Sequence, residues 1–521
     1  MAKIKRALIS VSDKEGIVDF AKGLRSLRME IISTGGTARF LKDAQIKVKL
    51  ISGVTNFPEI LDGRVKTLHP FIFGGILAKS NNPLHQKQLI AQQIELIDMV
   101  VVNLYPFQKT ISKKGVNLEE AIENIDVGGP SLLRAAAKNY PDVAVVINPK
   151  DYPLILEELG KNQGEISLET KKRLAFEVFE HTSSYDGIIA QYLRRNLSNS
   201  KKKTPSPSTL KIIGEKVLDL RYGENPHQSA SFYKEIFIDE ANLGEAIQLG
   251  GKELSFNNLV DLGAGLEIIK DFQKPTVVFI KHTNPCGLAS ASTTEKAYRK
   301  AYEGDPLSAY GSIIGINKVV NLQLAHLINE TTFVEAILAP DFEEGALSIL
   351  KQKLNRRIIK VGDLKKRDYQ IREIKKISGG FLVQDRDLKE LKVGDLKIVS
   401  ERKPNQEGLE ELLFAWKVAK HVKSNAIILT KNKQTVGIGA GQMSRVDAVK
   451  IAIMKSEGRS KGSYLASDAF FPFRDGVDEA AQAGVTAIIQ PGGSKRDEEV
   501  IEVANEHNLI MVFTGVRCFK H

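Results

Sequence analysis

Short apolar runs alternate with segments of helical periodicity along the first 200 residues, and this alternation limits the folds open to the chain. The apolar runs stand at residues 7–11, 30–33, 99–103 and 143–147. Between the first two, apolar residues recur at helical spacing, at Ile17, Phe20, Ala21, Leu24 and Leu27. Strands separated by such helices form a mostly parallel sheet with helices packed on it. The sequence therefore predicts an α/β fold with a doubly wound sheet.

A polar stretch at residues 199–209 divides the chain. It holds three consecutive lysines and two prolines, and it offers little that a core could bury. A chain of 521 residues is also too long for one compact core. We therefore expect a domain at 1–198, a linker at 199–209 and a second region at 210–521.

The second region echoes itself at an offset of about 150 residues. The echoed pairs are 277–280 with 426–429, 311–312 with 462–463, and 335–340 with 486–491. These echoes predict two similar α/β halves, although any protein rich in strands offers some by chance. Two such halves would place a site in the cleft between them.

Composition excludes several classes of protein. Apolar residues make up 42% of the chain and charged residues 26%, which is typical of globular proteins. The apolar runs fall far short of the ~20 residues that a membrane-spanning helix needs, and residues 7–11 are too short for a signal peptide. Two cysteines form no disulfide framework. We therefore expect a cytoplasmic protein that meets no membrane.

The net charge of +11 suggests an anionic partner. The lysines and arginines are dispersed, and no known nucleic-acid-binding module is present. This distribution favours small anions over nucleic acid.

Polar, Gly-rich segments follow the predicted strands of the first domain. Residues 33–37 could present backbone N–H groups to a phosphate at a helix N-terminus, or form a Gly turn with an N-cap threonine. Arg64 and Lys66 would point to the same side of an extended segment and could grip anionic oxygens; a solvated basic pair is the alternative.

Standard cofactor motifs are not satisfied. Gly251-Lys252 is followed by Glu253, which breaks a P-loop, and residues 437–441 lack the third glycine of a dinucleotide motif. The segment after His282 lacks the Glu of the zinc deaminases, and Cys286 has no cysteine three residues on. We expect no metal.

Lys281 and His282 end an apolar strand in the second region. A histidine there could carry a proton, and the lysine could stabilise negative charge; a structural histidine is equally compatible. Residues 468–475 are aromatic and framed by acids, so they could sandwich a flat heterocycle or form a core strand running into a helix cap. Cys286 is better explained as a small buried residue than as a nucleophile.

Several of these segments occur in the order seen in one family. They are residues 8–14, 62–70, 221–228, 281–287, 439–445, 467–475 and 513–517. Together they resemble the bifunctional purine-synthesis enzymes that combine 5-aminoimidazole-4-carboxamide ribonucleotide (AICAR) formyltransferase with inosine monophosphate (IMP) cyclohydrolase. The resemblance runs over essentially the full chain.

The resemblance implies a fold and two reactions. The N-terminal domain would be methylglyoxal-synthase-like, and the C-terminal region would consist of two cytidine-deaminase-like halves without zinc. The C-terminal region would move a formyl group from 10-formyltetrahydrofolate to the 5-amino group of AICAR, and the N-terminal domain would close formyl-AICAR to IMP with loss of water. No tightly bound cofactor or metal would be required, and the enzyme would be a homodimer with sites that share residues between subunits.

Position by position, the resemblance makes Lys281 and His282 the catalytic pair, with Asn425 orienting the histidine. It assigns AICAR binding to Arg221, Tyr222, Asn258, Arg445, Phe470 and Arg517, and folate binding to Glu335, Pro472, Phe473, Asp475 and Ser494. Two positions depart from the family pattern. Gly476 stands where Asn often follows the aspartate, and Glu335 stands where some members have Asp.

In the first domain the resemblance implies a phosphate cradle of Ser10, Ser12, Lys14, Ser33, Gly35, Gly36 and Thr37. The residues around the closing ring would be Arg64, Lys66, Thr67, Asn103, Tyr105, Asp126 and Lys138. Lys66 would donate a proton to the departing oxygen, and Tyr105 and Asp126 would assist the attacking nitrogen. Lys138 could equally be a surface lysine.

Two other classes of protein remain open. A basic RNA-binding module would need clustered cations or exposed aromatic side chains, and the sequence shows neither. An enzyme with one decayed domain would have lost one set of motifs, yet both sets are present.

Overall fold

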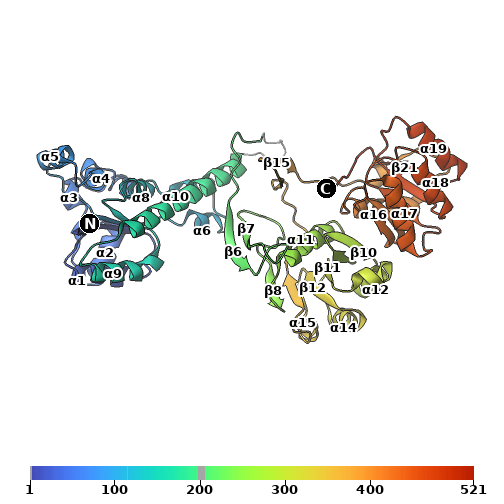
Figure 1. Ribbon diagram of the computed structural model, residues 1–521, viewed down its shortest axis with the longest axis horizontal. Helices are drawn as coiled ribbons and strands as arrows, with labels where there is room; N and C mark the ends of the chain where they lie inside the picture. The colour runs from blue at the N-terminus through green and yellow to red at the C-terminus, as the bar shows by residue number, and fades with distance from the viewer. Residues whose placement is uncertain (1–2, 114, 198–205) are drawn as a thin grey trace. The chain divides into compact units, whose positions relative to one another are not determined.

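The chain forms two α/β units, Met1–Ile213 and Gly214–His521. The computed structural model describes residues 3–113, 115–197 and 206–521 (Figure 1). The expected linker at 199–209 lies for the most part outside the described residues. Each unit is built around its own sheet.

The described part of unit 1 contains a five-stranded sheet in the order β3-β2-β1-β4-β5. Its strands are β1 (Arg6–Val11), β2 (Glu30–Ser33), β3 (Lys49–Leu50), β4 (Met99–Asn103) and β5 (Ala144–Val146). Every neighbouring pair is parallel. The chain runs outward from β1 to β3 and then returns to β4 beside β1. This order confirms the predicted doubly wound sheet, in which ligands bind beyond the carboxyl ends of the strands where the order reverses.

Helices surround this sheet. In α1 (Ile17–Ser26), the predicted face is buried at Ile17, Phe20, Ala21 and Leu24, and Leu27 forms the C-cap. The long α10 (Leu168–Leu197) packs on α8 (Gly128–Lys138) and on β5. The other helices are α2 (Gly35–Asp43), α3 (Ser52–Thr55), α4 (Pro70–Leu77), α5 (Pro83–Ala91), α6 (Phe107–Ile111), α7 (Leu118–Glu123) and α9 (Tyr152–Lys161), with 3₁₀ turns η1 (Leu61–Gly63) and η2 (Pro149–Asp151).

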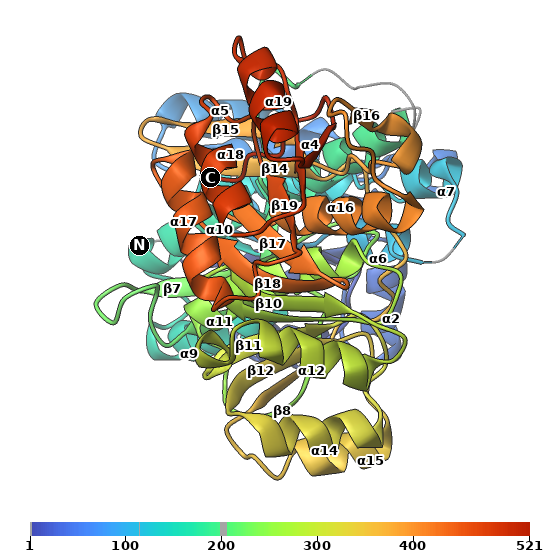
Figure 2. The same cartoon turned by 90° about the vertical axis from the view of Figure 1, so that its right-hand side faces the viewer.

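Unit 2 contains, within its described residues, a 12-stranded mixed sheet in the order β16-β21-β20-β19-β17-β18-β10-β9-β11-β12-β13-β8 (Figure 2). The strands of the first half are β8 (Ile247–Gly250), β9 (Thr276–Lys281), β10 (Asn284–Ser290), β11 (Ser312–Ile316), β12 (Val334–Ala339) and β13 (Arg357–Lys360). Those of the second half are β16 (Lys397–Ile398), β17 (Ile427–Lys431), β18 (Gln434–Gly439), β19 (Tyr464–Ser467), β20 (Ala487–Gln490) and β21 (Ile510–Phe513).

Two hairpins stand outside this sheet. They are formed by β6 (Gly214–Leu220) with β7 (Ala230–Glu235) and by β14 (Arg372–Ile377) with β15 (Gly380–Asp385).

The two halves of the large sheet have the same strand order and meet where β10 pairs antiparallel with β18. In each half, the two strands nearest this boundary form a hairpin, β9–β10 or β17–β18. The loop of each hairpin is two residues long. In both loops the two residues have positive φ, at His282 and Thr283 and again at Asn432 and Lys433. The repeat lies about 150 residues apart, as the sequence echoes predict.

Helices cover both faces of the sheet. One face carries α11 (Phe256–Lys270) and α16 (Gln406–Ala419). The other face carries α12 (Thr294–Gly304) and α14 (Leu322–Thr331) over the first half and α17 (Arg445–Ser456), α18 (Asp475–Gln482) and α19 (Asp497–Glu506) over the second. Two shorter helices are α13 (Pro306–Ala309) and α15 (Glu344–Leu350), and a 3₁₀ turn is η3 (Val393–Asp395).

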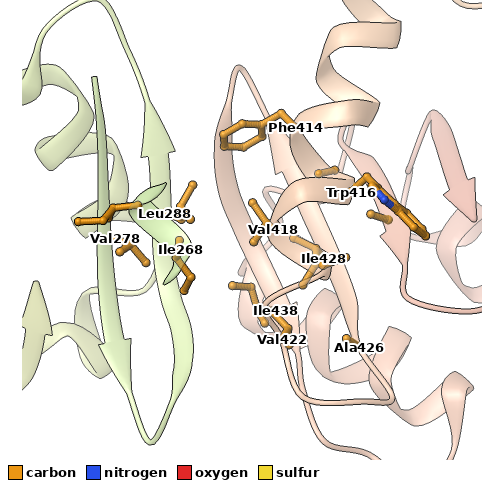
Figure 3. Packing of buried hydrophobic residues seen from close by; sticks show 14 of the residues in the cluster. Ile268, Val278, Leu288, Phe414, Trp416, Val418, Val422, Ala426, Ile428 and Ile438 are labelled. Carbon is orange, nitrogen blue, oxygen red and sulfur yellow. The ribbon is translucent and has the colours of Figure 1, made fainter. Parts of the chain in front are cut away.

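A single hydrophobic cluster under α11 and α16 joins the two halves. Figure 3 shows Ile268, Val278 and Leu288 of the first half on one side of this cluster. Facing them are side chains of the second half, among them Val418, Ile428 and Ile438. This shared core crosses the β10–β18 boundary. It therefore fixes the positions of the loops of the two halves relative to each other.

Two glycines of the pattern at residues 437–441, Gly437 and Gly439, serve packing. A Cβ on Gly439 would lie 1.9 Å from the carbonyl oxygen of Ala448 in α17, and one on Gly437 would lie 2.1 Å from that of Ala452. The first half repeats the contact, since a Cβ on Gly287 would lie 2.1 Å from the carbonyl oxygen of Ala301 in α12. These glycines let a helix approach its strand closely, which explains a pattern that does not fit a dinucleotide motif.

Replacing Gly439 with alanine should destabilise unit 2. The methyl group would meet backbone that has no flexible end to move aside, so we expect the free energy of unfolding to fall by about 3 kcal/mol, the upper part of the usual range for overpacking. Denaturant unfolding measures the change. As a control, Gly394→Ala places its Cβ where no atom lies within 4 Å, and it should change stability by no more than about 1 kcal/mol.

Candidate functional site

The predicted phosphate cradle lies at the carboxyl ends of β1, β2 and β4. Asn103 at the end of β4 accepts hydrogen bonds at Oδ1 from the N–H groups of Ser12 (2.5 Å) and Asp13 (2.9 Å). Thr37 Oγ1 bonds the N–H and the carbonyl of Val11, at 3.2 and 3.0 Å. The loop after β1 is thus fixed by side chains from both neighbouring strand exits.

Polar groups of the cradle continue this network. Ser10 Oγ lies 2.9 Å from Thr34 Oγ1, and Lys14 Nζ donates to Thr37 Oγ1 at 3.1 Å. Ser33 is buried and donates to the Ile9 carbonyl, whereas Gly35 and Gly36 are exposed in the first turn of α2. Burial lowers the pKa of Lys14. The structure therefore brings all the predicted cradle residues to one edge, with a cation beside a helix N-terminus that suits an anion.

Some of the residues expected around the closing ring lie near Asp126. Its carboxylate accepts hydrogen bonds from the N–H groups of Gly129 (2.8 Å) and Tyr105 (3.4 Å). Burial raises the pKa of Asp126, while these two N–H groups and the charge of Lys66 act in the opposite direction. The Tyr105 side chain is half exposed, and Thr67 is buried. Asp126, Tyr105 and Lys66 therefore share one neighbourhood.

Arg64 and Lys66 each have an acidic partner. The Arg64 guanidinium forms a two-point ion pair with Glu123, and Lys66 Nζ lies 3.4 Å from Glu59 Oε1. The Arg64 side chain nevertheless remains mostly exposed. Glu59 and Glu123 did not follow from the sequence pattern, because nothing in it shows which carboxylates approach the basic pair.

Lys138 lies apart from this group. It is the last residue of α8, whereas Asp126 lies two residues before the first. Because α8 has 11 residues, its two ends are about 16 Å apart. A single chain therefore does not bring Lys138 to Asp126.

In unit 2, the strand directions gather the expected residues of both halves at one edge of the large sheet. The antiparallel pairings of β9, β10, β18 and β17 place the turn after β9 beside the segment that enters β17. The same edge receives the exits of β18, β19, β20 and β21 and the entries of β12 and β13. A direct contact joins the halves here, since the Lys423 N–H donates to Asn284 Oδ1 at 2.9 Å.

Lys281 and His282 stand at the tip of the β9–β10 hairpin. Lys281 Nζ donates to the Tyr310 carbonyl at 2.8 Å, and the His282 side chain is exposed. His282 and Thr283 have φ of 51° and 64°, which costs roughly 1–3 kcal/mol for each such residue. Asp261 of α11 accepts the Thr283 N–H at 2.7 Å. Asp261 was not predicted, although its spacing of three from Asn258 places both on one face of α11.

Asn425 belongs to a buried network of the second half. Arg445 donates from Nη2 to Asn425 Oδ1 and from Nη1 to Asp468 Oδ1, both at 2.6 Å. Ser424 Oγ donates to the other oxygen of Asp468 at 2.6 Å, and Asn425 Nδ2 donates to the Gln442 carbonyl at 2.8 Å. Arg445, expected to bind AICAR, therefore also fixes the side chain of Asn425.

The expected AICAR residues of the first half are linked through α11. Asn258 Nδ2 donates to Glu335 Oε2 at 3.1 Å, and Arg357 lies 3.7 Å from the same oxygen. The neighbouring Asn257 donates to the Glu224 carbonyl at 3.3 Å, which ties the loop carrying Arg221 and Tyr222 to this helix end. Glu335, expected on the folate side, thus lies beside an expected AICAR residue.

The other expected folate residues lie after β19 and β20. The Arg496 guanidinium stands over the Phe473 ring at 4.9 Å, and the Ser494 N–H donates to Asp497 at 3.1 Å. Asp475 opens α18. The aromatic segment is divided, because Phe471 is fully buried in the core whereas Phe470 and Phe473 are exposed. Arg517 stands over the Phe519 ring at 4.4 Å.

Cys286 packs among hydrophobic residues of the first half, as the sequence suggested. Burial raises the pKa of its thiol to about 12, so the thiolate is scarce near neutral pH.

Among the described residues, no three His, Cys, Asp or Glu side chains are grouped so that they could hold a metal ion. In the same part of the chain, no helix combines the length and the apolar character that crossing a membrane requires.

Comparison with known proteins identifies a family and close relatives for this chain. The family model described as AICARFT/IMPCHase bienzyme matches residues 136–455, and the MGS-like domain matches residues 16–131. The chain is 56% identical to the bifunctional purine biosynthesis protein PurH of Acetivibrio thermocellus, over 99% of this chain and 100% of the relative. The PurH proteins of Ruminiclostridium cellulolyticum and Magnetococcus marinus are 52% and 51% identical, over 99% and 100% of this chain and the full length of each relative.

A solved structure, reported as the crystal structure of ForH, is 34% identical over 36% of this chain and 95% of its own, with a TM-score of 0.34. The MGS-like match confirms the fold class expected for the first domain.

Proposed function

The chain belongs to the AICARFT/IMPCHase bienzyme family, and we propose that its two units divide the two reactions of that family between them. The chain is a bifunctional enzyme of the last two steps of IMP synthesis. Unit 2 carries formyl transfer to AICAR, and unit 1 carries ring closure of formyl-AICAR. The observation that carries this division is that the two sets of expected residues line the edges of two separate sheets.

Formyl transfer needs a base, because the amine attached to the imidazole ring is a weak nucleophile. Its nitrogen attacks the formyl carbon of 10-formyltetrahydrofolate, His282 takes the amine proton, and the bond from the formyl carbon to the folate nitrogen breaks. Lys281 stabilises the tetrahedral oxyanion or supplies the proton to the departing nitrogen. Asn425, held by Arg445, orients His282.

The Asn284 contact with the segment entering β17 supports this arrangement. It fixes a residue two positions after His282 to a residue two positions before Asn425. The base and its orienting group are therefore anchored in halves that share one core.

Ring closure needs orientation more than activation, since the nucleophile and the electrophile already belong to one molecule. The carboxamide nitrogen attacks the formyl carbon, and water leaves. Lys66 protonates the departing oxygen, while Tyr105 and Asp126 assist the nitrogen as it loses its protons. The phosphate sits on the cradle at the N-terminus of α2, beside Lys14 and Thr37.

We assign the folate co-substrate to the surface formed by Pro472, Phe473, Asp475 and Ser494. The exposed Phe473 ring offers a face to a flat heterocycle. A homodimer accounts for two positions that one chain leaves apart: Lys138, about one helix length from Asp126, and Glu335, which contacts Asn258 in the first half. We place the enzyme in the cytoplasm.

Mixing the purified protein with AICAR and 10-formyltetrahydrofolate tests this assignment. We expect tetrahydrofolate and IMP to appear together, followed by absorbance and chromatography. Tetrahydrofolate without IMP would identify an inactive unit 1. No change in either would leave a protein that only binds.

A further inference from the structure

We infer that Asp261 is a positioning residue for formyl transfer, which holds the strained His282–Thr283 turn so that the imidazole is presented to AICAR. The inference rests on the proposed role of His282. Asp261 touches no substrate in this assignment. It acts through the backbone of the turn.

The turn needs a partner outside its own hairpin. A two-residue hairpin loop of type I′ requires positive φ at both residues, and Asn followed by Gly is the sequence that forms it most readily. Here the loop is His282 and Thr283, at φ 51° and 64°. Positive φ is a genuine outlier for a β-branched residue such as threonine. Thr283 is therefore poorly suited to the turn it occupies.

The carboxylate of Asp261 is the group placed to hold this turn. Its Oδ1 lies 2.7 Å from the backbone nitrogen of Thr283, and it projects from the N-terminal half of α11. Burial raises the pKa of Asp261, and the Thr283 N–H and the His282 charge act against that rise. The residue on the same face of α11, Asn258, is itself fixed by Glu335 and by the backbone of Ser255. The acceptor is thus presented by a rigid element.

The second half contains the same device at the opposite edge of the sheet. There Glu411 of α16 accepts the Lys433 N–H at 2.9 and 3.1 Å, and Asn432 and Lys433 have φ of 56° and 55°. Asp261 and Glu411 are 150 residues apart, as are Thr283 and Lys433. A carboxylate that holds the turn is therefore a feature of the repeat, and in the first half it supports the turn that carries the histidine.

The test compares Asp261→Ala with Asp261→Asn in the full-length enzyme. Alanine removes the acceptor, so kcat for formyl transfer should fall about 10- to 100-fold, the range expected when a reacting group is misplaced by about 1 Å. The KM values for AICAR and the folate should stay within about threefold, because other loops bind them. Asparagine keeps an oxygen for the Thr283 N–H and should retain kcat within about threefold of the unchanged enzyme.

A second substitution tests the turn itself. Glycine adopts positive φ without strain, so Thr283→Gly in the Asp261→Ala background should recover about five- to tenfold of the lost kcat. If the double variant is no faster than Asp261→Ala, the carboxylate does not act by holding the turn.

The matched control is Glu411→Ala, which removes the equivalent acceptor far from the expected site. It should leave formyl transfer unchanged, and the denaturant unfolding transition of unit 2 reports that each variant is folded. The inference is overturned if Asp261→Ala keeps full kcat, or if Glu411→Ala loses as much. A His282→Ala variant run alongside separates the two ideas. If it still transfers formyl groups, the proposed site fails; if it is inactive while Asp261→Ala is normal, only the positioning role fails.

Discussion

Replacing His282 with alanine should abolish formyl transfer while the same protein still closes supplied formyl-AICAR. The imidazole is the proposed base for a weakly nucleophilic amine, and such a base contributes about 10²- to 10⁴-fold. The His282 side chain is exposed, and its removal leaves the hairpin backbone and the Asp261 contact in place. Release of tetrahydrofolate measures the first reaction, and formation of IMP from formyl-AICAR measures the second.

His326→Ala provides the control, since it removes another exposed histidine of unit 2, on α14. Both reactions should proceed normally in that variant. Loss of both reactions from a folded His282→Ala protein would contradict the division of the chemistry between two units. Retained formyl transfer would remove His282 from the mechanism.

Local patterns in the sequence predict the elements and the strand exits of this chain well. The apolar spacing of α1 and the strand runs of unit 1 are visible because burial imposes a period on the sequence. The exits carry the expected polar residues because open α/β sheets bind ligands there. The sequence also shows the glycines at 437 and 439, but it does not show why glycine is needed there. The reason is the close approach of α17 to β18.

Contacts across the fold were less predictable. Asp261 accepts the N–H of Thr283, the residue after the expected His282, from 22 residues away in the chain. Asp468 accepts a hydrogen bond from the expected Arg445, 23 residues away. No periodicity reports such pairs, because each depends on how complete elements pack. The 150-residue echo could have indicated Asp261, since its counterpart Glu411 also carries a carboxylate.

Replacing Lys66 with alanine should have the reverse effect of the His282 substitution. Lys66 is the proposed proton donor to the departing oxygen, so ring closure should slow by about 10²-fold or more, while formyl transfer in unit 2 continues. Formyl-AICAR should then accumulate when AICAR and 10-formyltetrahydrofolate are supplied. The cost in stability should be small, because the Lys66–Glu59 pair is partly exposed and such pairs contribute about 0–1 kcal/mol. Lys87→Ala, an exposed lysine of α5, should leave both reactions intact. If Lys66→Ala closes the ring at the normal rate, orientation by the cradle and Asp126 suffices, and the oxygen leaves with a proton from water.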